Sequence, residues 1–231
     1  MFGAGGSIAE VLTGMPADCW AVVPLKTLSL AKQRLATVLL PEEREALVRC
    51  MLADVVTVLR RAQGLAGIVL VGDDPALASD DMLWIADPGT GLNGAITAAA
   101  SRLSSIGVTS MLTVAADLPL VTVAEIESVL AAAATSPVVI APDRARRGTN
   151  GLFLSPPLLL SPQFGNDSLK HHADAAQELG IVPIICDLPG FGFDVDLPED
   201  IDALRQLGGA RYAFLKQPGE LTKVTGPAAC H

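Results

Sequence analysis

Apolar runs of strand length alternate with helical segments along most of this chain, and this pattern limits its fold more than any other feature. The runs at 20–25 and 110–117 are short and mainly apolar, as in strands that are buried on both faces. Between them, residues 41–62 carry an apolar side chain at every fourth position from Leu47 to Leu59, which predicts an amphipathic helix. This alternation predicts the α/β class, as a three-layer α/β/α sandwich with a mainly parallel sheet.

The remaining segments continue the alternation. Further strands are expected at 67–74, 82–86, 137–143, 151–155 and 182–186, and further helices at 93–105, 122–134, 168–179 and 198–207. No internal repeat or low-complexity linker interrupts the series. We therefore expect a single domain over residues 19–208, with a loose N-terminal extension at 1–18 and a C-terminal tail at 209–231.

Composition narrows the classes of function. Half of the residues are hydrophobic, but no uncharged apolar run reaches the ~18–20 residues of a membrane span. The formal net charge is −9, which disfavours nucleic acid because phosphate backbones attract basic proteins. The N-terminus lacks the basic segment that opens a signal peptide, and the four cysteines show no C-x-x-C spacing. We therefore expect a cytoplasmic protein with reduced thiols that binds neither membranes nor nucleic acid.

The few basic residues gather after the first predicted strand. Lys26, Lys32 and Arg34 follow it, and no acidic residue lies between positions 19 and 41. In an open α/β sheet, ligands bind outside the carboxyl ends of the strands, where this loop emerges. The pattern predicts a phosphate-binding loop, and a solvated polar loop is the alternative interpretation.

Three aspartates also follow predicted strands. Asp117 ends the strand at 110–117, and Asp194 and Asp196 are separated by one residue, so in an extended segment they point to the same side. Neighbouring carboxylates repel each other unless a cation lies between them. If all three share one rim of the sheet with the basic loop, they describe a nucleoside-triphosphate site with Mg²⁺, which prefers carboxylates and phosphates. The structural alternative for Asp196 is a helix N-cap before Pro198.

Weaker candidates lie at other loops and helix starts. Asn93 opens a predicted helix after glycines and serves either as a cap or as a nucleotide contact. Asp73 is a candidate acceptor for the N1–H and N2–H₂ groups of guanine, with a turn-forming role as the alternative. Ser168 stands where an N-cap belongs, and a capped helix N-terminus also attracts anions. The adjacent His171 and His172 are expected to be solvated or close to a phosphate rather than catalytic.

Six motifs carry a resemblance over residues 19–207. They are AVVPLKTLSLAKQRL, LNGAI, AADLPL, RGTNGLFL, FGNDSLKHH and FDVDLPEDI, in this order. Together they resemble the 2-phospho-L-lactate / phosphoenolpyruvate guanylyltransferase family of coenzyme F-420 biosynthesis. That family is similar to the wider Rossmann-like nucleotidyltransferases of the nucleotide-diphospho-sugar transferase type. The resemblance implies transfer of GMP from GTP to the phosphate of a three-carbon acid, with release of pyrophosphate.

The resemblance also implies roles for particular residues. It places Lys26, Lys32 and Arg34 on the phosphates of GTP, with Lys26 also catalytic, and Asn93 and Asp73 are added as nucleotide contacts. It makes Asp117, Asp194 and Asp196 the catalytic ligands of Mg²⁺. It assigns Thr149, Gly165 and Ser168 to the acceptor, and the preceding Arg144, Arg146 and Arg147 are expected to supply further donors there.

The acceptor that the resemblance favours is phosphoenolpyruvate, with 2-phospho-L-lactate and 3-phospho-D-glycerate as the other choices. Two rival functions stay open: a nucleotidyltransferase for a sugar phosphate or molybdopterin, and a noncatalytic nucleotide-binding module. A dinucleotide-dependent oxidoreductase is disfavoured, because the loop after the first strand has no G-x-G-x-x-G. The protein is expected to be a monomer or a homodimer.

Overall fold

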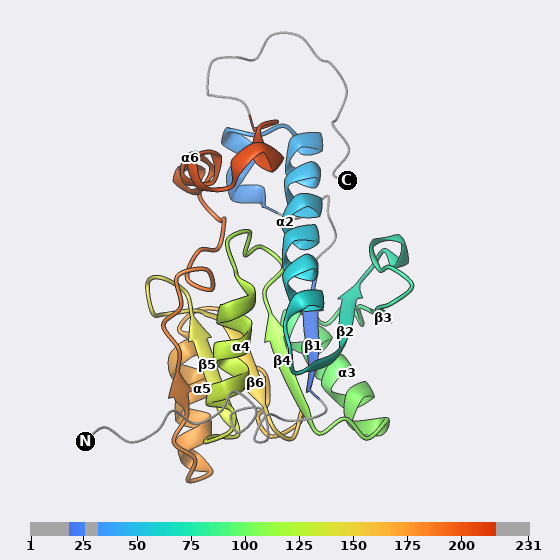
Figure 1. Cartoon of the computed structure of the whole chain (residues 1–231), viewed down its shortest axis with the longest axis vertical. Helices are drawn as coiled ribbons and strands as arrows, with labels where there is room; N and C mark the ends of the chain where they lie inside the picture. Colours follow the sequence, from blue (N-terminus) through green and yellow to red (C-terminus); the bar gives the residue numbers. More distant parts are fainter. Residues whose placement is uncertain (1–18, 26–31, 216–231) are drawn as a thin grey trace, which may run out of the picture.

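A seven-stranded sheet forms the centre of the protein (Figure 1). The computed structural model describes residues 19–25 and 32–215. The strands are β1 (Cys19–Pro24), β2 (Leu65–Gly72), β3 (Leu83–Ala86), β4 (Ser110–Val114), β5 (Val138–Pro142), β6 (Thr149–Leu154) and β7 (Ile184–Ile185). Their order across the sheet is β3-β2-β1-β4-β6-β5-β7. Among them β6 alone runs antiparallel to its neighbours, so the prediction of a mainly parallel sheet is confirmed.

Helices cover both faces of the sheet. The longer ones are α2 (Pro41–Arg61), α3 (Gly91–Ser105), α4 (Val123–Ala132), α5 (Ser168–Glu178) and α6 (Pro198–Leu207), and the short 3-10 helices are η2 (Gln33–Thr37), η3 (Pro75–Leu77) and η4 (Gly209–Tyr212). Strand β1 divides its side chains between two cores: Ala21 and Val23 pack in the core of α2, α4 and α6, whereas Val22 packs in the core of α3 and α5. The predicted three-layer α/β/α sandwich is therefore confirmed.

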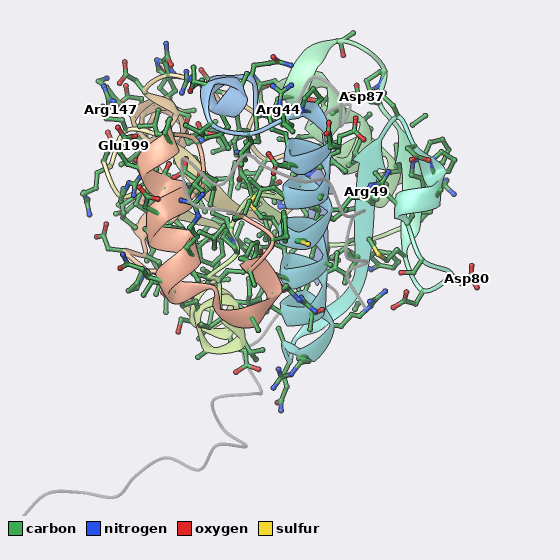
Figure 2. All side chains as sticks on the ribbon, turned by 90° about the horizontal axis from the view of Figure 1, so that it is seen from above. Arg44, Arg49, Asp80, Asp87, Arg147 and Glu199 are labelled. Atoms are coloured by element: carbon green, nitrogen blue, oxygen red, sulfur yellow. The ribbon has the colours of Figure 1, made fainter. Side chains whose placement is uncertain are left out.

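The longest helix follows directly from its sequence pattern. Along α2, Leu47 and Leu59 and the apolar residues at every fourth position between them are buried. Each such side chain contributes about 1.5–3 kcal/mol on burial. Acidic residues occupy the first turn and Arg60 and Arg61 the last, which complements the helix dipole. At the N-terminal end, Arg44 donates to Gln33 of η2 over 3.2 Å and so ties the first loop to the helix (Figure 2).

The reversed direction of β6 brings its first residues to the functional edge of the sheet. Because β4 ends where β6 begins, Thr149 and Asn150 lie at the carboxyl edge of the parallel strands. The carbonyl oxygen of Asn150 accepts from the N–H of Ala115 at 2.9 Å, which continues the pairing just beyond β4. An apolar run reads alike in both directions, so the sequence pattern alone did not predict this reversal.

The packed part of the chain continues past position 209, where the C-terminal tail was expected to start. Tyr212 is buried and its hydroxyl donates to Asp54 of α2. Leu215 is also buried, and its carbonyl oxygen accepts from Nε of Arg205 at 2.8 Å. Residues 209–215 therefore pack against α2 and α6.

Two further expectations concern the cysteines and the membrane. Cys186 is a free thiol, in agreement with the expectation of reduced thiols at that position. Across 19–25 and 32–215, no helix combines the length and the apolar character that a membrane crossing requires.

Candidate active site

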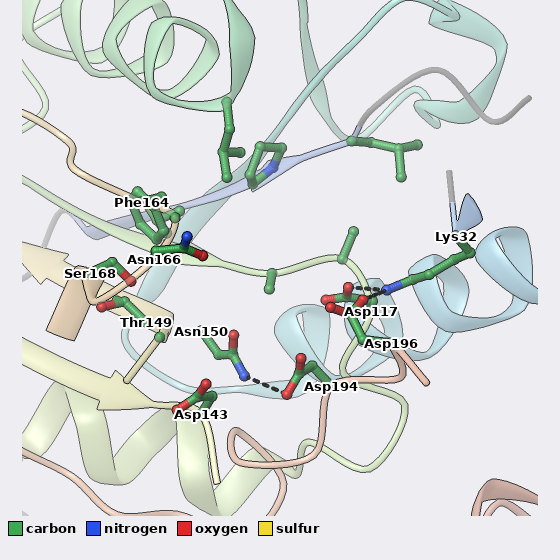
Figure 3. Close-up of a pocket in the computed structure, with 18 of the residues that line it drawn as sticks. Lys32, Asp117, Asp143, Thr149, Asn150, Phe164, Asn166, Ser168, Asp194 and Asp196 are labelled. Atoms are coloured by element: carbon green, nitrogen blue, oxygen red, sulfur yellow. Dashed lines mark hydrogen bonds and ion pairs between the residues drawn. The ribbon is translucent and has the colours of Figure 1, made fainter. Parts of the chain in front are cut away.

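A cleft of about 820 Å³ lies at the carboxyl edge of the sheet (Figure 3). Eight of the predicted site residues line it: Lys32, Arg34, Asp117, Thr149, Gly165, Ser168, Asp194 and Asp196. Lys26 lies outside the described residues. Asp73 is exposed at the end of β2, and neither it nor Asn93 belongs to the residues that line the cleft.

The Asp-Val-Asp segment explains how residues distant in sequence meet at this edge. The N–H of Val195 donates to the carbonyl oxygen of Asp117 at 3.3 Å, which fastens the segment to the end of β4. The Val195 side chain is fully buried in the core, whereas Asp194 and Asp196 both line the cleft. The alternation expected of an extended segment therefore places the two carboxylates on the same side of the backbone.

Lys32 joins two of these carboxylates. Its ammonium group contacts Oδ2 of Asp117 and lies 2.8 Å from Oδ1 of Asp196. Burial of the ammonium group favours a lower pKa, but the charges of Asp117 and Asp196 outweigh this effect and hold the pKa of Lys32 above its ordinary value. Arg34 adds a more distant charge, with Nη1 at 3.5 Å from Oδ2 of Asp196. The basic loop and the acids thus form one ionic cluster.

The third carboxylate lies in a less compensated position. Nδ2 of Asn150 lies 3.3 Å from Oδ1 of Asp194 and also donates to the carbonyl oxygen of Phe191 at 2.8 Å (Figure 3). Burial and the negative charges of Asp117 and Asp196 raise the pKa of the Asp194 carboxyl above its ordinary value. A cation at this position would remove that penalty. Asn150 belongs to the RGTN motif, but sequence reasoning gave it no role.

The backbone of the Asp-Val-Asp segment is supported by a buried acid. Oδ2 of Asp200 accepts from the N–H of Asp196 at 2.9 Å and from that of Leu197 at 2.7 Å. Burial raises the pKa of Asp200, but its bonds from Arg144 and from these N–H groups outweigh burial and lower the pKa below its ordinary value. Leu197, not Asp196, is the N-cap residue of α6. The capping interpretation of Asp196 is therefore wrong, and its carboxylate faces the cleft.

The opposite end of the cleft carries hydroxyl groups. Ser168 is 1% exposed, and its Oγ has no hydrogen-bond partner among the residues that the structure describes. It is the first residue of α5, whereas Asp167 is the N-cap residue, so the capping role expected for Ser168 is wrong. Gly165 lies in the preceding loop with φ +125°, a conformation that favours glycine. Thr149 begins β6 beside them (Figure 3).

The three arginines before Thr149 do not act together. Arg144 pairs with Asp200 and lies over the ring of Phe193, 5.7 Å from the ring centre. Arg146 pairs with Asp187. Of the three, Arg147 alone lines the cleft. The expectation that all three supply donors to this pocket is therefore wrong for Arg144 and Arg146, which neutralise carboxylates elsewhere.

Asn93 holds a loop in place. Its Oδ1 accepts from the N–H of Phe164 at 2.7 Å, and its Nδ2 donates to the carbonyl oxygen of the same residue at 3.2 Å. The N-cap of α3 is Thr90, so Asn93 is not the cap. Because its amide is engaged on both sides, Asn93 fixes the loop that carries Gly165.

The donor set fits a divalent cation that also binds phosphate. Asp117 and Asp196 already hold a cation, the ammonium group of Lys32, between them. Within the described ranges no group of three or more Asp, Glu, His or Cys side chains is arranged so that it could hold a metal ion by itself. Mg²⁺ and similar ions commonly take one or two carboxylates and complete their shell with phosphate oxygens and water. The cleft therefore suits an ion that arrives with a phosphorylated ligand.

The fold is that of the nucleotide-diphospho-sugar transferases. A structure from Desulfovibrio desulfuricans G20, provisionally assigned as such a transferase, matches with a TM-score of 0.71 and 16% identity, over 85% of this chain and 93% of the other. The Rv0371c protein of Mycobacterium tuberculosis H37Rv, solved with manganese, matches with a TM-score of 0.57 and 16% identity, over 82% and 99% of the two chains. At this identity the likeness concerns the fold.

Comparison of the sequence with known families assigns the chain to a narrower class. The family model "Guanylyl transferase CofC like" matches residues 19–219. A phosphoenolpyruvate guanylyltransferase of Rubrobacter xylanophilus is 40% identical over 198 residues, which cover 84% of this chain and 96% of the relative. The protein belongs to the CofC-like guanylyl transferase family.

Proposed function

We propose that this protein transfers GMP from GTP to the phosphate of phosphoenolpyruvate and releases pyrophosphate, as a step of coenzyme F-420 biosynthesis. The family and the name of the Rubrobacter xylanophilus relative support this acceptor. One structural observation carries the proposal. A single cleft has an ionic cluster of Lys32, Asp117 and Asp196 at one end and the hydroxyls of Thr149 and Ser168 at the other (Figure 3).

The two ends suit the two substrates. The acceptor phosphate is already ionised near neutral pH, so its oxygen needs alignment and charge compensation rather than a strong base. In this proposal Lys32 and Arg34 neutralise the phosphates of GTP. Thr149 and Ser168 are proposed to donate to the acceptor, because a buried hydroxyl gains most from a charged partner. The attacking and leaving oxygens can then lie roughly in line across the α-phosphate.

A divalent ion completes the proposed site. One or two carboxylates among Asp117, Asp194 and Asp196 would hold it together with phosphate oxygens, and Mg²⁺ is the ion that we expect. When bound, the ion supplies positive charge next to the phosphates. The raised pKa of Asp194 supports this assignment, because that carboxylate is buried beside two other acids. The structural neighbour that was solved with manganese supports it as well.

A matrix of substrates tests the proposal. GTP, CTP, ATP and UTP are each combined with phosphoenolpyruvate, 2-phospho-L-lactate, 3-phospho-D-glycerate and a sugar phosphate, and pyrophosphate release is measured. We expect release that requires both GTP and phosphoenolpyruvate. Release with CTP and a sugar phosphate instead would favour the rival transferase, and nucleotide binding without release in any combination would favour the noncatalytic module.

Two variants, one inside the cleft and one outside it, provide the test and its control in this assay. Asp117→Asn removes one charge from the ionic cluster and should abolish release. Asp80→Asn removes a charge of the same kind from an exposed position outside the cleft and should leave the rate unchanged (Figure 2). A similar loss in both variants would contradict a specific role for the cluster.

A further inference from the structure

A buried histidine stands behind the hydroxyl end of the cleft. His172 is fully buried, whereas its neighbour His171 is exposed. Of the two alternatives expected for these histidines, solvation is therefore wrong for His172. Its Nδ1 lies 3.1 Å from Oγ1 of Thr149, and its Nε2 lies 2.9 Å from the backbone nitrogen of Gln163. The ring of Phe164 packs edge-on against it, with the ring centres 4.9 Å apart.

These contacts determine which ring nitrogen carries the proton. A backbone N–H can only donate, so Nε2 of His172 accepts from Gln163 and carries no proton. Burial, and to a lesser degree the charge of His171, lower the pKa of His172 to about 4, so the ring is neutral near pH 7. A neutral imidazole with an unprotonated Nε2 holds its proton on Nδ1. Nδ1–H therefore donates to Oγ1 of Thr149.

This donation constrains the hydroxyl of Thr149. Its oxygen accepts from His172, which leaves its own proton to be donated elsewhere. Among residues 19–25 and 32–215, Thr149 Oγ1 has no second hydrogen-bond partner. Thr149 lines the cleft, so the direction that remains for the proton is into the cleft. Ser168 precedes His172 by four residues on the same face of α5 and adds its unpartnered hydroxyl there.

We propose that His172 is a positioning residue that turns Thr149 into a committed hydrogen-bond donor for an anionic oxygen of the acceptor. The inference rests on the proposed function, in that the acceptor is a phosphorylated acid bound at this end of the cleft. His172 touches neither the acceptor nor the nucleotide in this scheme. It acts through Thr149, and its bond from Gln163 selects the tautomer.

Two substitutions separate the two ring nitrogens. His172→Asn places an amide N–H near Nδ1 and keeps a donor for Thr149, whereas His172→Gln reaches toward Gln163 and loses that donor. We expect His172→Gln to lower kcat/KM for the acceptor by about 2- to 10-fold, as expected for the loss of the neutral hydrogen bond that orients the Thr149 hydroxyl. His172→Asn should stay close to the wild type, and the Kd for GTP should be unchanged in both. If both variants weakened GTP binding as much as they lowered kcat/KM for the acceptor, His172 would have only a structural role, and the proposal would be overturned.

A double-mutant cycle tests the route through Thr149. Thr149→Val removes the hydroxyl and preserves the shape of the side chain. If His172 acts through that hydroxyl, adding His172→Gln to Thr149→Val should lower kcat/KM for the acceptor by less than about 2-fold, because the two changes remove the same interaction. Fully additive losses would overturn the proposal.

A spectroscopic measurement is independent of turnover. Nitrogen NMR of the imidazole ring in the substrate-free protein should show a protonated Nδ1 and an unprotonated Nε2 for His172, with His172→Gln identifying the signals. A proton on Nε2 would overturn the proposal even if the enzyme is fully active. Conversely, an inactive protein with a protonated Nδ1 would contradict the proposed function and leave the tautomer assignment standing.

Discussion

Nζ of Lys32 lies 2.8 Å from Oδ1 of Asp196, although 164 positions separate the two residues in sequence. The same ammonium group contacts Asp117. These are two of the carboxylates that we propose as metal ligands. Ammonium and metal therefore compete for the same negative charge, and metal binding favours movement of Lys32 toward the phosphates of GTP. This competition leads to the first prediction.

Removal of the ammonium group should strengthen metal binding in the absence of nucleotide. For Lys32→Gln we expect Mn²⁺ to bind at least about 10-fold more tightly. This change corresponds to the loss of about 1.4 kcal/mol of electrostatic competition from the ammonium group. Turnover should fall, because the phosphates lose a cation. A titration followed by the electron paramagnetic resonance of free Mn²⁺ measures the affinity. Lys170→Gln, which removes an exposed lysine paired with Asp174, is the control; unchanged or weaker Mn²⁺ binding in Lys32→Gln would contradict the competition.

Neutralisation of Asp194, the site carboxylate with the fewest compensating contacts, should abolish turnover without destabilising the fold. Because burial and neighbouring charges raise the pKa of Asp194, its ionised form costs stability in the absence of a cation. We expect Asp194→Asn to lose turnover while its Tm stays equal or rises. Pyrophosphate release above about a tenth of the wild-type rate, which is a loss of only ~1.4 kcal/mol in the barrier, would speak against a metal-ligand role.

The layers of the fold were predictable because they depend on local periodicity. The apolar repeat from Leu47 to Leu59 faces the core, as its spacing indicates. The direction of β6 was not predictable, since the pairing of Leu152 with Thr113 depends on contacts between distant segments rather than on the run itself. The reduction of the predicted strand at 182–186 to Ile184–Ile185 likewise depends on its position at the sheet edge beside β5.

The site was predictable where residue type and strand ends coincide, as at Asp117 and the Asp-Val-Asp segment. It was not predictable where the partner of a side chain is decided in three dimensions. Arg144 points to Asp200 and Asn93 to the backbone of Phe164, and neither partner can be read from spacing. His172 was expected to be solvated or close to a phosphate, whereas the helix buries it and exposes His171, and its partners Thr149 and Gln163 cannot be read from spacing.

The buried histidine should give the protein a defined loss of stability in mild acid. The unfolded chain binds a proton at His172 near pH 6.5, but the folded protein binds it only near pH 4, so stability is complete above 6.5 and falls between these values. By about pH 5 the loss should reach about 2 kcal/mol. Urea unfolding at about pH 7.5 and about pH 5 measures it.

Comparison with His172→Gln isolates this contribution, because the variant should lose correspondingly less stability over the same interval. His171→Gln controls for the loss of an imidazole from α5 at an exposed position. An equal loss of stability in the wild type and His172→Gln would show that other groups cause the acid sensitivity.

Activity should be sensitive to a side chain at Gly165, in the loop that we propose for the acceptor. Gly165 has φ +125°, although a Cβ added there meets no described atom within 4 Å. The cost of Gly165→Ala is therefore conformational, on the order of 1–3 kcal/mol, and not steric. We expect a raised KM for the acceptor with little change in GTP binding. Gly107→Ala, also at positive φ but after α3 and outside the cleft, is the matched control; a raised KM in both variants would contradict a specific role for the loop.

The most direct test of the central claim is the identity of the product. Purified protein is incubated with GTP, phosphoenolpyruvate and Mg²⁺, and phosphorus NMR follows the reaction. We predict that the signals of both substrates decline together while pyrophosphate and a new phosphoanhydride appear in equal amounts, with coupling between the GMP phosphorus and the acceptor phosphorus. Release of pyrophosphate without that coupled pair of signals, or at a rate independent of phosphoenolpyruvate, would contradict guanylyl transfer to this acceptor.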